Sequence, residues 1–346
     1  MLRSLAGGSA RVALTALTML VAGGGAAPAP VPALPDTEAA EHKVGKFVWA
    51  DLFTAEVDAS RAFYAELFGW RWQPIARGEQ PYEVADVDGR PVAGMVFRAP
   101  PRDAEVRGTW LGYVATDDAE AAAASVTAAG GRVLVPPVDV PDRGVHAIFA
   151  DPEGAVFGVL EAPGGDPADY RAEPGEWAWV HLFADDVEAT TSFYAGLFGY
   201  EDHAWGDAHR VLASAGASRA GVGPSDGDGD LHPGWLGFVR VEDVEAAVAR
   251  AGALGGETLF APTADVLDGE LAVVADPAGA AVGLLELSDV EADAWEGGPD
   301  EESRESGAAA SDVSSPDAAT AHAEPGTAPE GDEADPGVGG QGAESP

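Results

Sequence analysis

The chain has 346 residues, of which 46 % are hydrophobic, so its length leaves room for two domains with substantial cores. Its 59 acidic and 19 basic residues give a formal net charge of −40, which argues against nucleic acid as a partner because phosphate contacts need lysine and arginine. The absence of cysteine excludes disulfides, thiolate metal sites and cysteine nucleophiles.

The chain begins with the pattern of a secretory signal peptide, predicted over residues 1–26. Arg3 and Arg11 precede an uncharged run that is too short to span a membrane, and small residues follow it. The sequence therefore predicts an exported protein with no membrane span in the mature chain. The alternative is a wrongly assigned start codon and a cytoplasmic protein. A Pro/Ala-rich linker is predicted at 27–44.

One pattern then occurs twice. Residues 45–70 and 175–200 share 12 of 26 identities, and they end in the near copies FYAELFGW and FYAGLFGY. Later stretches of the two halves match in the same way. We therefore expect two homologous domains at 45–162 and 175–287, joined by a linker at 163–174.

Each domain is predicted to contain the order βαβββ twice. The stretch at 46–53, KFVWADLF, alternates like a strand, and the next apolar residues have helical spacing up to Gly69. Three strand-like stretches follow, and the second half of the domain repeats this order. Each unit leaves one sheet face uncovered, so two units are expected to pair around a trough. The predicted fold class is α+β, with four βαβββ units in two domains of curled mixed sheets and helices outside.

The last segment, 288–346, consists mostly of Gly, Ala, Pro, Ser, Asp and Glu. Such a composition cannot bury enough apolar surface to offset the entropy lost on ordering. We predict a disordered acidic tail that keeps the protein solvated, or one with no specific role.

The repeated stretches resemble a known superfamily. The helix ends FYAELFGW and FYAGLFGY, the run AGGRVLVPPVDVPDRGVHAIFADPEGAVFGVLEAP and the run DPAGAAVGLLEL are similar to the vicinal oxygen chelate superfamily. It includes glyoxalase I, extradiol dioxygenases and bleomycin- and fosfomycin-resistance proteins. The resemblance implies two glyoxalase-like domains of a tandem bacterial subgroup. It implies little about function, because this superfamily hosts many chemistries and non-catalytic binders.

The resemblance also identifies the positions where relatives hold a metal. They fall on residues that lack metal-binding side chains: Trp49, Leu111, Gly158 and the stretch 93–95 in domain 1, and Trp179, Leu236, Gly283 and the stretch 220–222 in domain 2. None of these side chains binds a hard or borderline metal. The sequence therefore predicts no metal and no other cofactor.

Strand alternation identifies the side chains that face each trough. Phe47, Trp49, Asp51 and Phe53 are expected to share a face in domain 1, as are Trp177, Trp179, His181 and Phe183 in domain 2. Leu111 and Tyr113, or Leu236 and Phe238, are expected to approach from the facing unit. The predicted ligand-binding residues are Trp49, Asp51, Leu111, Tyr113, Trp179, His181 and Phe238. An aromatic trough with few polar groups suits a small aromatic or flat organic ligand.

Three functions stay open at this point. The first is a metal-independent small-molecule binder, with domain 1 favoured because it keeps the loop PPVDVPDRG. The second is a lyase, isomerase or dioxygenase with a metal at other positions, using Asp51 or His181 with Glu161 or Glu286. The third is a structural module whose troughs are filled by Trp49 and Trp179. A monomer is expected, because the tandem domains can pair within one chain.

Overall fold

The computed structural model describes residues 41–77, 80–99, 107–141, 143–225 and 233–287. The predicted signal peptide, the predicted acidic tail and most of the predicted N-terminal linker lie outside the described residues. No helix in the described part of the chain is both long enough and apolar enough to cross a bilayer.

The first half of the described chain forms one eight-stranded mixed sheet and two helices. Its elements are β1 (Phe47–Thr54), α2 (Val57–Phe68), β2 (Arg71–Arg77), β3 (Gln80–Val87), β4 (Arg90–Phe97), β5 (Thr109–Ala115), α3 (Ala119–Ala128), β6 (Arg132–Val140), β7 (Gly144–Ala150) and β8 (Val156–Glu161). The strand order is β2-β3-β4-β1-β5-β8-β7-β6. Strands β1 and β4 are parallel, as are β5 and β8, while β1 and β5 are antiparallel. The two βαβββ units therefore join at the centre of the sheet.

The second half repeats this plan. Its elements are β9 (Trp177–Ala184), α4 (Val187–Phe198), β10 (Glu201–Trp205), β11 (His209–Ser214), β12 (Ala217–Pro224), β13 (Gly234–Val241), α5 (Val244–Ala253), β14 (Glu257–Phe260), the 3-10 turn η1 (Leu267–Gly269), β15 (Leu271–Ala275) and β16 (Ala281–Glu286). The strand order β10-β11-β12-β9-β13-β16-β15-β14 is equivalent to that of the first sheet. The predicted fold class, four βαβββ units paired into two glyoxalase-like domains, is confirmed.

Glycine ends the aromatic helices, as the sequence predicts for α2. Gly69 after α2 and Gly199 after α4 have φ angles of 72° and 69°, in the left-handed region that favours glycine. At the start of α4, the Asp186 carboxylate accepts a hydrogen bond from the backbone N–H of Ala189. Local sequence signals therefore set both ends of α4.

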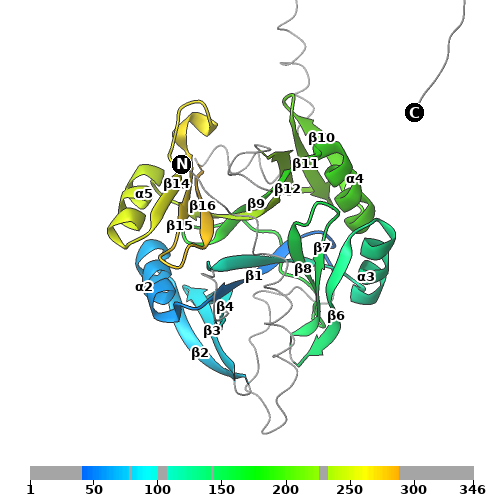
Figure 1. The fold of residues 1–346 in the computed structure, drawn as a ribbon, viewed down its shortest axis with the longest axis horizontal. Helices are drawn as coiled ribbons and strands as arrows, with labels where there is room; N and C mark the ends of the chain where they lie inside the picture. The colour runs from blue at the N-terminus through cyan, green and yellow to red at the C-terminus, as the bar shows by residue number, and fades with distance from the viewer. Residues whose placement is uncertain (1–40, 78–79, 100–106, 142, 226–232, 288–346) are drawn as a thin grey trace, which may run out of the picture. The chain divides into compact units, whose positions relative to one another are not determined.

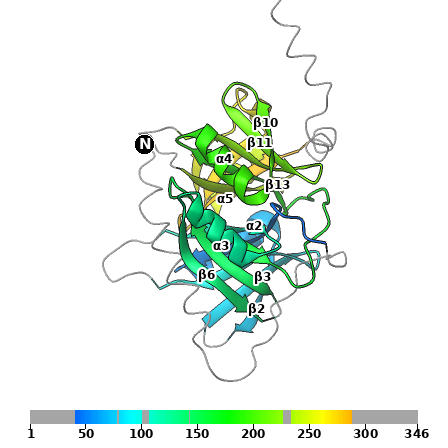
Figure 2. The ribbon, with the colours of Figure 1, turned by 90° about the vertical axis from the view of Figure 1, so that its right-hand side faces the viewer.

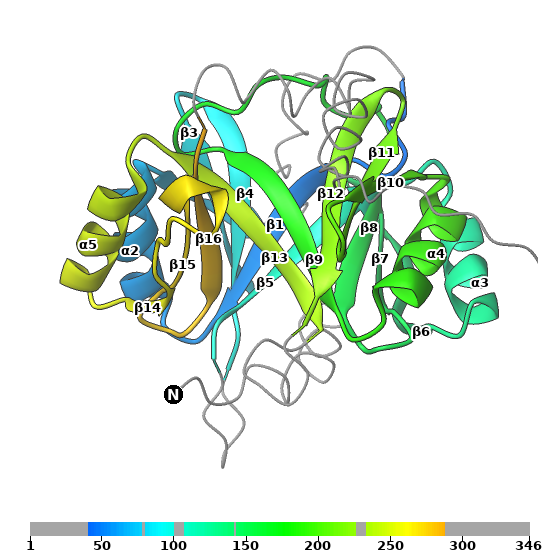
Figure 3. The ribbon, with the colours of Figure 1, turned by 90° about the horizontal axis from the view of Figure 1, so that it is seen from above.

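The helices pack in pairs that join the two domains. Helix α2 contacts α5, and α3 contacts α4, so each pair contains one helix from each domain (Figures 1 and 3). Figure 2 shows α3 and α4 lying side by side. Two of the buried apolar clusters contain residues of both domains; Phe63 of α2 and Val244 of α5, for example, share one cluster. Burying one apolar side chain of this size stabilises the folded protein by about 1.5–3 kcal/mol.

The ends of the repeated motif connect the domains by hydrogen bonds. The indole Nε1 of Trp70, at the end of FYAELFGW, donates to the backbone carbonyl of Gly175, 2.7 Å away. The hydroxyl of Tyr200, at the end of FYAGLFGY, donates to the carbonyl of Gly45, 2.5 Å away. Each aromatic residue thus contacts the glycine that starts the other repeat. The repeated helix is therefore a packing element in both domains.

The predicted shared face of the first strands is wrong for Phe47 and Trp177. The pairing of β1 with β5 shifts register between Phe47 and Trp49, and the pairing of β9 with β13 shifts at the equivalent place. Such a bulge inserts one residue and turns the preceding side chain to the other face. Phe47 and Trp177 consequently contact each other between the domains, with ring centroids 5.8 Å apart.

Candidate functional site

The buried inner face of the domain 1 sheet brings together the four residues predicted to line its trough. Trp49 and Asp51 on β1 are 2 % and 6 % exposed, and Leu111 and Tyr113 on β5 are 4 % and 0 % exposed. The antiparallel register places Trp49 opposite Tyr113 and Asp51 opposite Leu111. Strand alternation therefore gives the correct face for these four side chains, and their role in binding a ligand stays a prediction.

Asp51 is the centre of a buried hydrogen-bond network. Its Oδ1 atom accepts from the indole Nε1 of Trp49 at 2.8 Å and from the hydroxyl of Tyr82 at 2.9 Å. A carboxylate that accepts two such bonds holds both aromatic rings in fixed positions. Asp51 thus orients Trp49 within the trough.

Arg143 is a trough residue that sequence reasoning missed. It is 3 % exposed, and its guanidinium carbon lies 3.9 Å from the centre of the Trp49 ring. None of its three side-chain nitrogen atoms has a hydrogen-bond partner among the described residues, and the same is true of the Tyr113 hydroxyl. Burial, reinforced by the charge of Asp51, raises the pKa of Tyr113 well above its ordinary value. The only sequence signal for Arg143 is its place in the loop PPVDVPDRG.

The trough of domain 2 contains a different set of groups. His181 on β9 is 9 % exposed, and its ring lies 4.8 Å from that of Phe183 and 6.0 Å from that of His209. Burial, helped by the nearby His209, lowers the pKa of His181 to about 4. Phe238 on β13 is 3 % exposed, whereas Trp179 is only partly buried. At neutral pH this trough therefore presents a neutral imidazole between aromatic rings.

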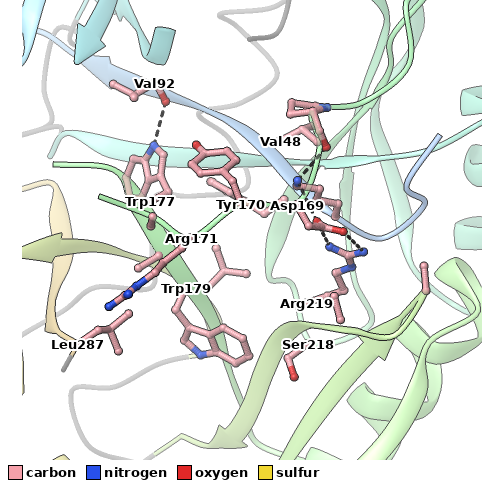
Figure 4. A pocket seen from close by; sticks show the side chains of 18 of the residues that line it. Val48, Val92, Asp169, Tyr170, Arg171, Trp177, Trp179, Ser218, Arg219 and Leu287 are labelled. Atoms are coloured by element: carbon pink, nitrogen blue, oxygen red, sulfur yellow. Dashed lines mark hydrogen bonds and ion pairs between the residues drawn. The ribbon is translucent and has the colours of Figure 1, made fainter. Parts of the chain in front are cut away.

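Trp179 lines a pocket between the two domains rather than an enclosed trough. The pocket has a volume of about 430 Å³ (Figure 4). Its walls include the aromatic rings of Tyr170, Trp177 and Trp179, and the Nε1 atom of Trp177 donates to the carbonyl of Val92 at 2.9 Å. The domain 1 residues Trp49, Asp51, Leu111 and Tyr113 do not line it. The sequence did not predict this pocket, because it depends on how the domains pack.

The charged groups of the pocket pair with one another. Arg219 donates to both carboxylate oxygens of Asp169, and the ammonium group of Lys46 lies 3.0 Å from the same carboxylate. Burial alone would raise the pKa of Asp169, but the hydrogen bonds from Arg219 and Lys46 outweigh it, so the pKa lies well below its usual range. This pocket thus contains one carboxylate shared by two cationic side chains, which leaves an excess of positive charge.

Comparison with known proteins then identifies the family. Residues 46–159 match the model of the Glyoxalase/Bleomycin resistance protein/Dioxygenase superfamily, and residues 179–285 match that of a glyoxalase-like domain. The chain is also 30 % identical over 251 residues to the "Putative glyoxylase CFP32" of Mycobacterium tuberculosis, covering 71 % of this chain and 96 % of the relative. The chain belongs to the glyoxalase/bleomycin resistance/dioxygenase superfamily.

Other known proteins are also similar to most of the chain. The anthracycline biosynthesis protein DnrV of Streptomyces peucetius is 34 % identical over 267 residues, covering 70 % of this chain and 94 % of that protein. Two solved structures share the fold at low identity. The Mn(II)-bound glyoxalase from Novosphingobium aromaticivorans is 18 % identical, with 74 % of this chain and 93 % of that chain covered and a TM-score of 0.50. The 2,3-dioxygenase LapB from Pseudomonas sp. KL28 is 13 % identical, with 72 % of this chain and 94 % of that chain covered and a TM-score of 0.51.

The residues at the positions that the resemblance assigns to metal ligands do not fit a metal. Within the described ranges, no group of three or more His, Cys, Asp or Glu side chains comes together to hold an ion. The ring of Tyr113 occupies the space where a side chain at Gly158 would begin, and the ring of Phe238 does the same at Gly283. These positions therefore lack both donor atoms and room for them.

The glutamates considered for a non-standard metal site have another role. Glu161 accepts a hydrogen bond from the backbone N–H of Ala119, and Glu286 accepts one from that of Val244, each at 3.0 Å. These amides start α3 and α5, where a carboxylate satisfies unpaired N–H groups and complements the helix dipole. Both glutamates thus point to the helix side of the sheet, away from the trough.

The close contact at Gly158 gives a stability prediction. Because Tyr113 fills the Cβ position, Gly158→Ala forces the ring or the strand to move, and we expect the free energy of unfolding to fall by about 1–3 kcal/mol. In the control, Gly196→Ala, the new methyl group lies at an exposed position of helix α4 and meets no atom within 4 Å. That substitution should raise stability by up to about 1 kcal/mol. Urea denaturation measures both, and equal effects would contradict the assigned position of Tyr113.

Proposed function

We propose that the protein is a metal-independent small-molecule binding protein that takes a flat, aromatic organic ligand in the trough of domain 1. The observation that carries this proposal is the buried hydroxyl of Tyr113, which makes no hydrogen bond of normal geometry with any described residue, although Asp51 and Trp49 lie beside it. Buried polar groups are nearly always hydrogen-bonded, so an exception in an aromatic trough points to a ligand atom as the partner.

The chemistry of the trough supports binding more than metal-dependent catalysis. Leu111 and Gly158 stand at positions where the superfamily places metal ligands, and neither supplies a donor atom. Trp49 offers an aromatic surface, and Asp51 holds its indole in place. The relative named for anthracycline biosynthesis is consistent with an organic small molecule as the ligand. The trough side chains are buried, so binding requires a local side-chain movement of the kind common at interfaces.

Calorimetric titration of EDTA-treated protein against a panel of planar aromatic compounds tests this proposal. We expect at least one compound to bind, its affinity to be unchanged by EDTA, and Tyr113→Phe to weaken binding roughly tenfold because one buried hydrogen bond is lost. Tyr170→Phe is the matched control, since Tyr170 is 46 % exposed and lines only the interdomain pocket.

Three outcomes would contradict the proposal. Loss of binding after EDTA treatment would indicate a metal-dependent site. Loss of binding in Trp179→Phe but not in Tyr113→Phe would place the ligand in the interdomain pocket. The absence of binding by every compound would favour a structural module with filled troughs. The predicted export and the predicted monomeric state stay predictions.

A further inference from the structure

We infer that the ligand of the domain 1 trough is an aromatic carboxylate, whose anionic group pairs with the guanidinium of Arg143. This inference rests on the proposed function, because it names the chemical class of the ligand in the same trough. It starts from the burial of Arg143, which is 3 % exposed and whose Nε and both Nη atoms lack hydrogen-bond partners in the described ranges.

Two other arginines of the described residues have oxygen partners for their guanidinium groups. Arg219, whose side chain is 4 % exposed, donates to both oxygens of Asp169. Arg240, which is partly buried, donates from both terminal nitrogens to backbone carbonyls. Arg143 has no such partner among the described residues. A buried, unpaired charge costs far more free energy than a paired one.

The backbone and the neighbouring groups hold Arg143 in this position. Its own N–H donates to the carbonyl of Val140 at 3.0 Å in the turn between β6 and β7. The next residue, Gly144, has a φ of 112° and no space for a side chain. The stacking of the guanidinium on Trp49 supplies a cation–π contact. That contact leaves all five N–H donors unused, since an aromatic face accepts none of them in a normal hydrogen bond.

The protein offers no anion to complete this site within the described residues. Asp51 is the carboxylate of the trough, but its Oδ1 accepts from Trp49 and Tyr82, and no described carboxylate lies within 4.0 Å of the Arg143 nitrogens. The acceptor is therefore assigned to the ligand. The net charge of −40 repels anions in general, so a specific cation is needed to admit one.

The geometry of the guanidinium defines the ligand class. Its planar fork matches the two oxygens of a carboxylate, which it binds through two parallel hydrogen bonds. Tyr113 adds a neutral O–H donor, because burial keeps its pKa well above the neutral range. Trp49 adds an aromatic wall. An aromatic ring that carries a carboxylate satisfies all three groups together, whereas a neutral aromatic molecule leaves Arg143 unpaired.

Matched pairs of acids and amides test this inference. Benzoate, 2-naphthoate and anthraquinone-2-carboxylate, each with its primary amide, are titrated calorimetrically into the full, EDTA-treated chain. Each amide keeps the ring and removes the charge. We expect at least one acid to bind at least tenfold more tightly than its amide. Arg143→Gln should abolish this preference, and Arg143→Lys should retain part of it, because lysine supplies the charge without the fork.

A surface arginine provides the control. Arg210→Gln replaces a residue that pairs with Asp202 on domain 2, and it should leave the preference for the acid unchanged. Thermal melts of every variant confirm that each is folded at the titration temperature. Equal binding of acid and amide would overturn the inference and leave the proposed function standing. A preference that survives in Arg143→Gln would overturn the role of Arg143. Binding by none of the six compounds would overturn both proposals.

Discussion

Trp70→Ala should lower the free energy of unfolding by about 3–5 kcal/mol, which is the usual range for removing a buried tryptophan. Trp70 is 1 % exposed, and its indole donates to the carbonyl of Gly175 in the other domain. Its ring lies 5.4 Å from that of Tyr64 and 5.9 Å from those of Trp110 and Trp177. The substitution removes apolar contacts and leaves a buried carbonyl without its donor.

Urea denaturation followed by circular dichroism measures this effect. Because Trp70 joins a core shared by both domains, we expect the two domains to unfold in a single transition, before and after the substitution. Trp205→Ala is the control, since Trp205 lies on β10 and is 42 % exposed. That variant should lose much less stability. Two separate transitions in the wild type, or a cost at Trp70 close to that at Trp205, would show that the shared core does not couple the domains.

The stability of the protein should fall as the pH is lowered from 6.5 towards 4, because His181 is buried as a neutral imidazole. Burial and the neighbouring His209 lower the pKa of His181 from 6.5 to about 4 in the folded protein. In this range the unfolded chain binds a proton at this residue and the folded protein does not, so acidification favours unfolding. At pH 4 this proton binding lowers the free energy of unfolding by about 3 kcal/mol relative to neutral pH.

The slope of unfolding free energy against pH tests this prediction. His181→Gln removes the titrating group, so its stability should fall less steeply than that of the wild type between pH 6.5 and 4. His203→Gln, at a side chain that is 25 % exposed, should keep the wild-type slope. Carboxylates that titrate in the same range contribute equally to all three proteins, and their effect cancels in the comparison. Identical slopes for wild type and His181→Gln would contradict the buried, neutral state.

The sequence by itself determined the repeat, the βαβββ order, the family and the face of the main trough residues. These features depend on local periodicity. A strand turns alternate side chains to opposite faces, so Trp49 and Asp51 share a face whatever surrounds them. Glycine at the end of an aromatic helix likewise stops it through its own backbone freedom, as at Gly69.

Only the tertiary structure decided the parts that depend on contacts distant in sequence. The register shift at Phe47 turns that ring towards the other domain, and alternation alone cannot reveal an inserted residue. The pairing of Trp70 with Gly175 and the pocket beside Trp179 arise from how the two domains pack. Arg143 lies 94 positions after Trp49 along the chain, yet its guanidinium covers the Trp49 ring. Folding brings them together because β7 pairs with both β6 and β8. This pairing places the turn between β6 and β7, which carries Arg143, beside the trough.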